Sequence, residues 1–318
     1  MKTKEIIKNA LCEESGYVSG EELAEKLGIS RAAVCNAVKE LNKEGIKTKA
    51  VTNRGYMLVN GEDIVSESGI KKYLKTGGLK FIIADKVFST NSKLKEFGEK
   101  GEPEGLIMIA DEQEKGKGRF DRKFYSPKGG IYMSVLLRPK TEPSQAVSIT
   151  TAMAVAVCRA VDSAANVETK IKWVNDIFLN NKKVCGILTE AVLGMEAGGV
   201  DYAVIGLGIN VYEPIGGFSK EISGVAGAIS SGEKIDKNKL IAAVLDNFFI
   251  YYYKLPEKIY AEEYVKRSMV LGEKILVLKN GNARKAVAEA LDGDLRLKVK
   301  YENGEEQYLD SGEISVKI

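Results

Sequence analysis

The sequence predicts an α+β fold made of three consecutive parts, and three observations support this prediction. In residues 1–62, apolar residues at helical spacing precede two short β segments. Between residues 63 and 269, apolar runs of strand length mix with longer helical runs. Residues 270–318 alternate short β segments with glycine turns. A chain of 318 residues is long enough for three such domains.

The composition is that of a globular protein with a substantial core, since 44% of the residues are hydrophobic and 29% are charged. The net charge of +3 is too small to demand nucleic acid as a partner of the whole chain. The first residues are charged and helix-forming, so we expect no signal peptide. We also expect no apolar run that approaches the roughly 20 residues of a membrane span. The four cysteines contain no CxxC pair, which favours the reducing cytoplasm over a disulfide framework or zinc site.

The chain contains no histidine. Its absence excludes a nucleophile activated by histidine and a metal ion held by imidazole. Any chemistry must therefore use lysine, arginine, carboxylates, backbone N–H groups or a metal ion held by oxygen ligands.

The N-terminal region predicts three helices. Residues 4–14 carry apolar side chains on one helical face. The pattern Ser-x-x-Glu at residues 19–22 is a capping box that opens a second helix, which Gly28 ends. Ser30 can cap a third helix, which Gly45 ends.

Two short strands follow at residues 46–51 and 56–59, joined by a turn at residues 53–55. Helix, turn, helix and hairpin in this order are typical of a winged helix-turn-helix, whose third helix enters the major groove by its N-terminal end. The candidate DNA-binding residues are Ser30, Arg31, Asn36 and Lys39 on that helix and Arg54 on the wing. The excess of basic over acidic residues here is small, so we expect a dimer to present two such units. A helical protein-interaction module is the alternative.

The central region follows a polar linker with a short helix at residues 61–80, which includes Gly61. We expect strands at residues 81–84, 106–110, 131–137, 170–173, 177–179, 184–190 and 202–210, with a hairpin turn at residues 180–182. We expect helices at residues 145–164, 237–253 and 257–267, and a long loop at residues 213–235. The last region has turns at Asn280-Gly281, Gly293, Asn303-Gly304 and Gly312 and predicts a small β-barrel.

The segment from residue 113 to residue 127 carries the strongest functional signal. Gly116 and Gly118 alternate with the basic residues Lys117 and Arg119, and further basic and aromatic residues follow. Glycines let backbone N–H groups approach an anion, and basic side chains supply the counter-charge. Aromatic rings can lie flat on a planar ligand. The segment therefore suits a phosphate-bearing nucleotide.

Three other elements accompany this loop along the chain. Ser89-Thr90-Asn91 offers short polar groups at a helix start. Lys172-Trp173-Val174-Asn175-Asp176 precedes the element Lys183-Val184-Cys185-Gly186-Ile187-Leu188. Gly206-Leu207-Gly208-Ile209-Asn210 ends a strand in an amide flanked by glycines. In this order, the elements resemble those of the biotin protein ligases, and in particular the bifunctional ones that also repress the biotin operon.

The resemblance covers essentially the whole chain and implies a winged helix-turn-helix (1–62), a mixed α/β ligase domain similar to class II synthetases (63–269) and an SH3-like barrel (270–318). The family loop Gly-Arg-Gly-Arg-Arg-Gly-Arg-Lys-Trp departs here at Lys117, Phe120-Asp121 and Phe124. Val174 replaces the proline of Lys-Trp-Pro-Asn-Asp. The elements at residues 183–188 and 206–210 are intact. We expect the departures in the loop to alter retention of the intermediate.

The resemblance implies two half-reactions. The carboxylate of biotin attacks the α-phosphate of ATP to give biotinyl-5′-AMP and pyrophosphate, and a lysine of biotin carboxyl carrier protein then attacks the mixed anhydride. The first step needs positioning and charge neutralisation, with Mg²⁺ assisting, rather than a strong base. Biotin is then both the substrate and the precursor of a corepressor, and a homodimer binds operator DNA.

By matched position, Lys183 and Arg119 are the expected catalytic residues. The expected biotin-binding residues are Ser89, Thr90, Asn91, Gln113, Gly116, Lys117, Arg119, Lys183 and Gly186. The expected ATP- or adenylate-binding residues are Gly118, Arg122, Phe124, Lys172, Asn175 and Asn210. We expect Trp173 and Ile187 in the pocket wall and assign no metal ligand. Asp176 is either a structural carboxylate or one that lies beside a metal ion. Cys185 lies two residues from Lys183, hence on the same strand face, and we expect it to be a small core residue.

Three alternatives remain at this point. A lipoate or octanoate ligase would share the fold but would not explain the helix-turn-helix. A ligand-sensing repressor that has lost catalysis would explain the altered loop. A ligase whose N-terminal unit no longer binds DNA is disfavoured by residues 30–33, Ser-Arg-Ala-Ala, at the start of the third helix.

Overall fold

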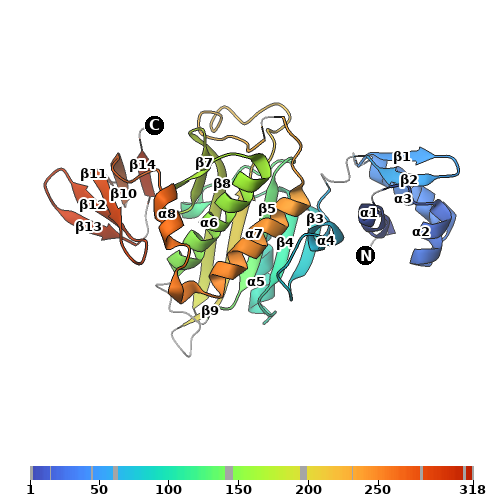
Figure 1. Cartoon of the computed structure of the whole chain (residues 1–318), viewed down its shortest axis with the longest axis horizontal. Helices are drawn as coiled ribbons and strands as arrows, with labels where there is room; N and C mark the ends of the chain where they lie inside the picture. The colour runs from blue at the N-terminus through green and yellow to red at the C-terminus, as the bar shows by residue number, and fades with distance from the viewer. Residues whose placement is uncertain are drawn as a thin grey trace. The chain divides into compact units, whose positions relative to one another are not determined.

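The computed structural model describes residues 3–14, 16–43, 46–59, 64–139, 146–193, 199–230, 232–279, 282–310 and 313–316. The chain divides into two compact units, Met1–Lys75 with Ile235–Ala243, and Thr76–Lys234 with Val244–Ile318 (Figure 1). Several predicted features lie outside the described residues: Gly45, Gly61, the boundary between residues 62 and 63, the helix start at residue 145, the Asn280-Gly281 turn and Gly312.

The first unit contains the helical region and its hairpin. Its elements are α1 (Thr3–Glu13), α2 (Gly20–Leu27), α3 (Arg31–Lys43), β1 (Thr48–Val51), β2 (Gly55–Leu58) and α4 (Glu67–Lys71). The predicted caps are confirmed: Ser19 Oγ accepts from the Glu22 N–H at 3.0 Å, and Ser30 Oγ accepts from the Ala33 N–H at 3.1 Å. Gly28 ends α2 in the left-handed region, with φ 63°. Strands β1 and β2 pair antiparallel as the predicted wing.

The core of this unit explains why three short helices hold together. Ile7 and Leu11 of α1 meet Leu23 of α2 and Val34 and Leu41 of α3, and all five are almost completely buried. Burying one such side chain contributes about 1.5–3 kcal/mol, far more than helix propensity supplies.

The N-terminal part of α7 (Lys237–Tyr252), as far as Ala243, belongs to the first unit. The side chain of Asn238 accepts a hydrogen bond from the Ser66 N–H at 3.0 Å and donates one to the Ile64 carbonyl at 2.8 Å. Two residues far apart in the chain are thereby joined, and the segment before α4 is fixed.

The second unit is built on a seven-stranded sheet with the strand order β3-β4-β5-β9-β8-β7-β6. The strands are β3 (Lys80–Val87), β4 (Leu106–Gln113), β5 (Ile131–Leu137), β6 (Lys170–Lys172), β7 (Asp176–Leu179), β8 (Lys182–Leu193) and β9 (Val200–Ile209). All seven predicted strands form. β3 and β4 pair parallel, and the other neighbours pair antiparallel. Asn180 and Asn181, both with positive φ, make the two-residue turn between β7 and β8.

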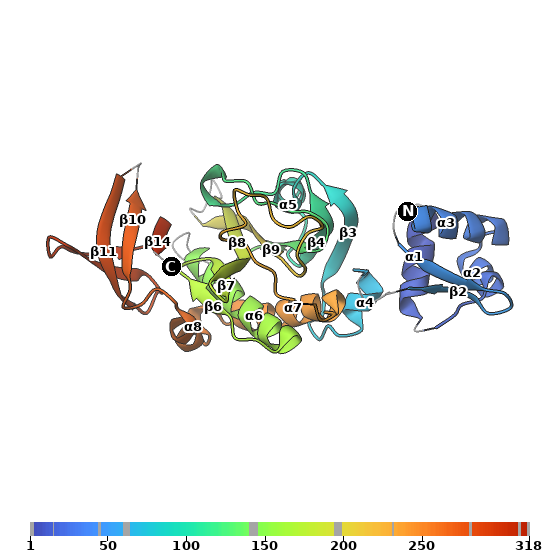
Figure 2. The same cartoon turned by 90° about the horizontal axis from the view of Figure 1, so that it is seen from above.

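Helices cover both faces of this sheet (Figure 2). α5 (Thr90–Glu99) packs on β4, β5 and β9, whereas α6 (Ala146–Ala165) packs on β7 and β8 from the other side. α6 corrects one expectation, because Val147–Ala165 is long and apolar enough to cross a membrane by length and composition. Most of this segment is buried inside the protein, so its apolar character reflects its place beneath the sheet.

The helix predicted at residues 257–267 is shorter than expected. The chain forms a 3₁₀ turn at Leu255–Glu257, and α8 begins only at Ala261 and runs to Arg267. Lys258 adopts φ 45° in the left-handed region, which interrupts the α-helical path.

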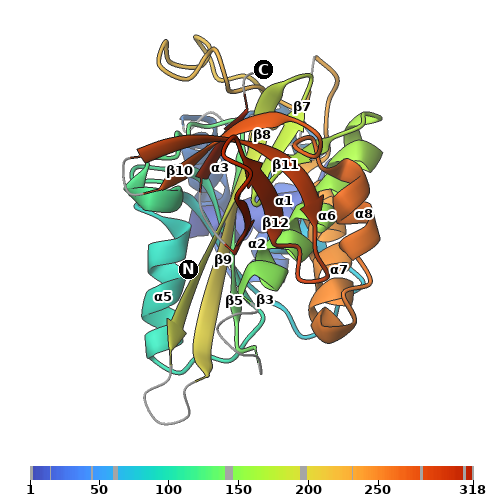
Figure 3. The same ribbon diagram turned by 90° about the vertical axis from the view of Figure 1, so that its left-hand side faces the viewer.

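The C-terminal region is an antiparallel sheet with the order β13-β12-β11-β10-β14 (Figure 3). Its strands are β10 (Lys274–Lys279), β11 (Asn282–Leu291), β12 (Leu297–Tyr301), β13 (Glu306–Leu309) and β14 (Glu313–Val316). A bulge between Ala288 and Ala290 bends β11. This five-stranded antiparallel sheet forms in the region of the predicted small barrel and belongs to the second unit.

Candidate functional site

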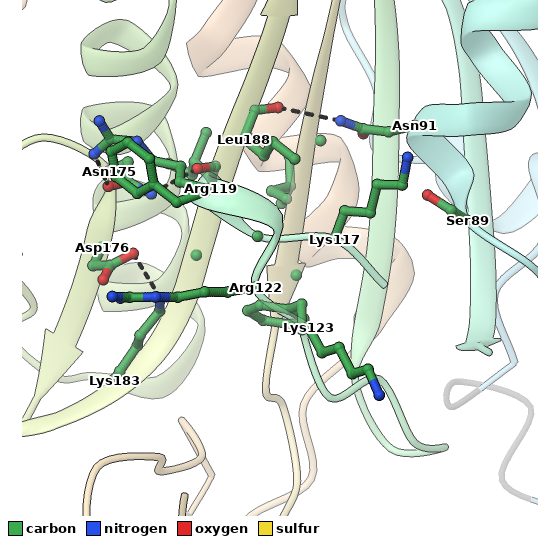
Figure 4. Close-up of a pocket in the computed structure, with 18 of the residues that line it drawn as sticks. Ser89, Asn91, Lys117, Arg119, Arg122, Lys123, Asn175, Asp176, Lys183 and Leu188 are labelled. Carbon is green, nitrogen blue, oxygen red and sulfur yellow. Dashed lines mark hydrogen bonds and ion pairs between the residues drawn. The ribbon is translucent and has the colours of Figure 1, made fainter. Parts of the chain in front are cut away.

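A cavity of about 200 Å³ opens on the face of the seven-stranded sheet that carries α5 (Figure 4). It brings together thirteen of the predicted site residues: Ser89, Thr90, Asn91, Gln113, Lys117, Gly118, Arg119, Arg122, Phe124, Lys172, Asn175, Lys183 and Gly186. The two residues expected in its wall, Trp173 and Ile187, also line it. Segments from six regions of the sequence therefore meet at one place.

The floor of the cavity is one row of residues across four strands. Gly208 of β9 pairs with Gly186 of β8, Gly186 pairs with Asp176 of β7, and Asp176 pairs with Lys172 of β6. Residues directly opposite each other in a sheet point to the same face. The register therefore places the carboxylate of Asp176 and the amine of Lys172 beside the two glycines, which have no side chain.

The glycines of the floor are required by what lies on them. A Cβ atom at Gly208 would stand 2.3 Å from Phe124 Cε1, and one at Gly186 would stand 3.0 Å from Phe124 Cε2. At Gly206 it would stand 1.9 Å from Asn91 Oδ1. The Gly-x-Gly pattern thus gives the ring of Phe124 and the amide of Asn91 room to lie against the sheet.

The glycine-rich loop folds back on itself over this floor. The Phe124 N–H donates to the Gly116 carbonyl at 2.8 Å, and the Gly118 N–H donates to the Arg122 carbonyl at 2.7 Å. At its tip Phe120 adopts φ 56°, and its side chain is 61% exposed. The family departure at Phe120 therefore stands at an exposed point of the loop, in a conformation that few non-glycine residues adopt.

One end of the cavity is lined by short polar side chains. The N–H and the hydroxyl of Thr90 lie 2.9 and 3.0 Å from Gln113 Oε1, and Gln113 Nε2 donates to Ser126 Oγ at 3.0 Å. Ser89 caps α5 by accepting from the Ser92 N–H at 3.4 Å. The start of α5 and the end of β4 therefore hold a set of short donors and acceptors in one place.

The other end is strongly basic. The described residues that line the cavity include six basic side chains, Lys117, Arg119, Arg122, Lys123, Lys172 and Lys183, and a single carboxylate, Asp176. Lys183 Nζ lies 2.7 Å from Asp176 Oδ1, and Arg119 donates to Asn175 Oδ1 at 3.1 Å. Figure 4 shows Lys183 and Arg122 beside Asp176, with Ser89 and Asn91 across the cavity. Such an excess of cations attracts an anionic ligand.

A β-bulge decides where Lys183 points. Ile177 of β7 pairs with Cys185, but the next residue, Phe178, pairs with Lys183, so β8 carries one extra residue between them. Lys183 consequently shares the cavity face with Gly186, and the expectation that Lys183 and Cys185 share a face is wrong. Cys185 is fully buried on the opposite face, where burial raises the pKa of its thiol. It is a core residue.

Two predicted residues do not line the cavity. Gly116 is packed beneath the loop, where a Cβ atom would stand 2.4 Å from the Phe124 carbonyl oxygen. Asn210 donates from its side chain to the Gly227 carbonyl at 2.9 Å and from its backbone to the Val184 carbonyl at 2.8 Å. In this structure Gly116 permits the loop to close, and Asn210 fastens the segment around Gly227 beside β8.

Sequence reasoning missed several residues. Phe120, Lys123, Asp176, Leu188, Leu207 and Ile314 line the cavity without having been assigned to it. Ser134 lies beneath the polar end, 2.7 Å from Thr90 Oγ1, and is fully buried. Its signal was present, because Ser134 is the one short polar side chain on β5, among apolar residues and Tyr132. Ile314 gave no local signal, since it belongs to the distant C-terminal sheet.

The five predicted DNA-binding residues lie in the first unit. Ser30, Arg31, Asn36, Lys39 and Arg54 are all exposed. Ser30 caps the N-terminus of α3, and Arg31, Asn36 and Lys39 lie on α3. Arg54 lies in the turn of the wing. The Arg54 guanidinium is 6.0 Å from the centre of the Tyr17 ring.

Comparison with known proteins gives consistent results for both units. Residues 84–210 match the biotin/lipoate A/B protein ligase family, and residues 3–57 match a helix-turn-helix domain. The chain is 39% identical over 236 residues to the bifunctional ligase/repressor BirA of Bacillus spizizenii, covering 73% of this chain and 72% of that protein. It is 38% identical to BirA of Bacillus subtilis, covering 72% and 71%. The biotin protein ligase of Aquifex aeolicus, solved with biotin and ATP, shares 27% identity and a TM-score of 0.64, covering 75% of this chain and 98% of that one.

Proposed function

This chain belongs to the biotin protein ligases of the bifunctional ligase/repressor type, and we propose that the cavity on its central sheet carries out both steps of biotin transfer. The protein is a biotin–[acetyl-CoA-carboxylase] ligase that uses ATP and carries a DNA-binding repressor domain. One observation carries the proposal: an end lined by short polar side chains and a basic end share one cavity, with Lys183 in the basic end.

In the first step, a carboxylate oxygen of biotin forms a bond to the α-phosphorus of ATP, and the bond from this phosphorus to the pyrophosphate oxygen breaks. The carboxylate is already ionised, so no base is needed. Both reactants are anions, and their mutual repulsion is the main obstacle. Lys183, Arg119 and Arg122 would neutralise this charge from the basic end of the cavity.

In the second step, the amine of an acceptor lysine attacks the carbonyl carbon of the mixed anhydride. The carbon–oxygen bond to AMP breaks, AMP leaves, and an amide forms. We assign the acceptor to biotin carboxyl carrier protein. The nucleophile comes with the partner, which fits a chain without histidine.

Lys183 changes its partner during the cycle in this proposal. Before binding, it is paired with Asp176 at 2.7 Å. The carboxylate of biotin and the α-phosphate of ATP would compete with Asp176 for the ammonium group of Lys183. Asp176 would then be available to a cation. Magnesium is held in such sites by one or two carboxylates together with substrate phosphates. No cluster of three or more metal-ligating side chains exists in the described chain, so Asp176 and the phosphates would hold Mg²⁺, which neutralises phosphate charge.

Recognition of the biotin head falls to the polar end. A ureido group offers two N–H donors and one acceptor oxygen, which suits the hydroxyl of Thr90, the cap of Ser89 and the amide of Gln113. Phe124 lies against Gly186 and Gly208 and would pack against the adenylate. Asn175 is held by the Ile187 carbonyl at 2.8 Å and would keep Arg119 over the intermediate.

The first unit would bind operator DNA through α3 and the wing. Its basic excess is small, so two copies in a homodimer would be needed for firm binding. Biotinyl-5′-AMP would act as the corepressor. We place the protein in the cytoplasm, with no membrane partner. We propose that the DNA-binding domain ends at residue 62 and that the ligase domain ends at residue 269.

The decisive experiment incubates the protein with biotin, MgATP and a carrier domain. We expect release of pyrophosphate and a biotinylated acceptor lysine, detected by mass spectrometry. Lipoate or octanoate in place of biotin should give no transfer. Biotin binding without release of pyrophosphate would instead indicate a sensor that has lost catalysis and would overturn the proposed catalytic role of the cavity.

A further inference from the structure

A chain of polar contacts leads from the surface of α5 to the polar end of the cavity. Lys95 Nζ lies 2.9 Å from Glu190 Oε1, and Asn91 Nδ2 donates to Glu190 Oε2 at 2.9 Å. Ser134 Oγ lies 2.6 Å from Asn91 Oδ1 and 2.7 Å from Thr90 Oγ1. Lys95, Glu190 and Ser134 have no assigned part in the reaction. The contacts that they make nevertheless lead to Thr90, which lines the cavity.

Glu190 fixes the orientation of the Asn91 amide. A carboxylate can only accept hydrogen bonds, so the NH₂ group of Asn91 must face Glu190 and its oxygen must face Ser134. A weaker contact from Asn91 Nδ2 to the Leu188 carbonyl, at 3.4 Å, agrees with this orientation. Burial acts to raise the pKa of Glu190, but hydrogen bonds from Asn91 and Lys95 outweigh it and lower that pKa, so the carboxylate is ionised at neutral pH.

The hydroxyl protons then have one consistent arrangement. Ser134 Oγ donates to Asn91 Oδ1 at 2.6 Å and to Thr90 Oγ1 at 2.7 Å, so its single proton is shared between these two acceptors. The hydroxyl of Thr90 donates in turn to Gln113 Oε1 at 3.0 Å. One lone pair of Thr90 Oγ1 is therefore left for the cavity.

We propose that Glu190, acting through Asn91 and Ser134, is a positioning residue that sets Thr90 as a hydrogen-bond acceptor for an N–H group of the ligand head. This inference rests on the proposed binding of biotin at this end. A ureido head supplies such an N–H group, whereas a dithiolane or an alkyl chain supplies none. The carboxylate would thus favour a ureido ligand without touching it, because loss of a matched donor leaves a buried polar group unpaired.

The test compares Glu190→Gln with a matched control, Glu96→Gln. Glu96 lies on the exposed side of α5 and pairs with Lys93, away from the cavity. We expect Glu190→Gln to raise the Kd for biotin about tenfold and to raise the KM for biotin but not for ATP, because a neutral amide no longer dictates the orientation of Asn91. Glu96→Gln should leave both constants unchanged. Binding is measured by calorimetry, and thermal melts verify folding.

A double-mutant cycle with Thr90→Val separates positioning from a general structural effect. If Glu190 acts through Thr90, Glu190→Gln should cost little further affinity once the hydroxyl of Thr90 is gone. Independent, additive losses would overturn the inference, as would an unchanged biotin Kd for Glu190→Gln. If Glu190→Gln does not fold, Ser134→Ala interrupts the same chain and should weaken biotin binding in the same way, and unchanged binding there counts equally against it. Absence of biotin binding by the unaltered protein would overturn the proposed function and this inference together.

Discussion

Lys183 owes its position to one irregularity in β8. In a regular strand, residues three apart point to opposite faces, so Lys183 and Gly186 would be separated. The extra residue between Cys185 and Lys183 puts the amine on the same face as the glycine floor. Bulges often redirect a side chain next to an active site.

At the residue scale, Lys183→Ala should slow formation of biotinyl-5′-AMP by about 10²–10³-fold, the usual cost of removing one donor that stabilises charge in the transition state. Pyrophosphate release measures the rate. Lys170→Ala is the control, because Lys170 is exposed on the outer strand β6 and lies outside the cavity lining. An unchanged rate for Lys183→Ala would remove its assigned role.

Gly208→Ala tests the packing of the floor. Its methyl group would stand 2.3 Å from Phe124 Cε1, so the ring must move. We expect the KM for ATP to rise about tenfold while the free energy of unfolding falls by about 1–3 kcal/mol, the usual cost of overpacking. Gly199→Ala is the control, because nothing lies within 4 Å of a Cβ atom there. A Gly208→Ala protein with normal kinetics would contradict the placement of the adenylate beside Phe124.

At the scale of elements, α8 holds β6 and therefore Lys172 and Trp173. The Met269 N–H donates to the Ile171 carbonyl at 3.0 Å. Arg267 on α8 lies 2.6 Å from Asp162 Oδ2 on α6 and 2.9 Å from Glu263 Oε1, and Arg159 also pairs with Glu263. The ion pairs thus join α8 to α6, and the backbone bond from Met269 fastens the outermost strand beside them.

This cluster predicts a pH dependence of stability. Burial acts to raise the pKa of Glu263, but hydrogen bonds from Arg159 and Arg267 outweigh it, and the pKa is lowered. A lowered carboxyl pKa stabilises the folded state above the unfolded value of about 4.3, and this contribution is lost as the pH falls. Glu263→Gln should lower the free energy of unfolding by about 1–2 kcal/mol at pH 7.

Urea unfolding at pH 7, 5 and 3.5 measures this difference. It should be largest at pH 7 and smaller at pH 3.5, because the contribution of the charge declines once the pH falls below the unfolded pKa. Glu262→Gln, at the neighbouring exposed position, should change little at any pH. A loss of stability for Glu263→Gln that does not vary with pH would show that packing, not charge, is responsible.

At the scale of the whole molecule, the chain has two units with separate cores, and the two activities fall in different units. The DNA-binding residues are in the first unit and the ligase cavity is in the second. Substitutions on the exposed face of α3 should therefore affect repression without affecting ligation.

Arg31→Ala should weaken binding to the chain's own upstream DNA and reduce the slope of log K against log salt by about 1 for each phosphate that Arg31 neutralises. Gel-shift titrations over a salt series, with biotin and ATP present or absent, measure this. The rate of biotin transfer should be unchanged. Lys71→Ala on α4 is the control. Binding that is absent or independent of salt would argue against the DNA-binding role of α3.

The local features could be predicted because neighbours in the chain determine them. Ser19 and Ser30 cap helices through donors three residues away, and Asn180 and Asn181 tolerate the backbone of a two-residue turn. The Gly-x-Gly pattern was visible as well, but its reason was not. The atoms that exclude a side chain there belong to Phe124 and Asn91, each more than eighty residues away.

The sequence by itself determined the family, the α+β class, the helix-turn-helix with its wing, and thirteen of the residues that line the cavity. Only the tertiary structure decided the face of Lys183, the pairing of Lys183 with Asp176, and the chain from Glu190 to Thr90. Motifs and caps depend on contacts within a few residues, which a linear pattern records. Strand register, bulges and hydrogen-bond networks depend on contacts between distant segments. They are therefore determined only once the sheet and α5 have packed together.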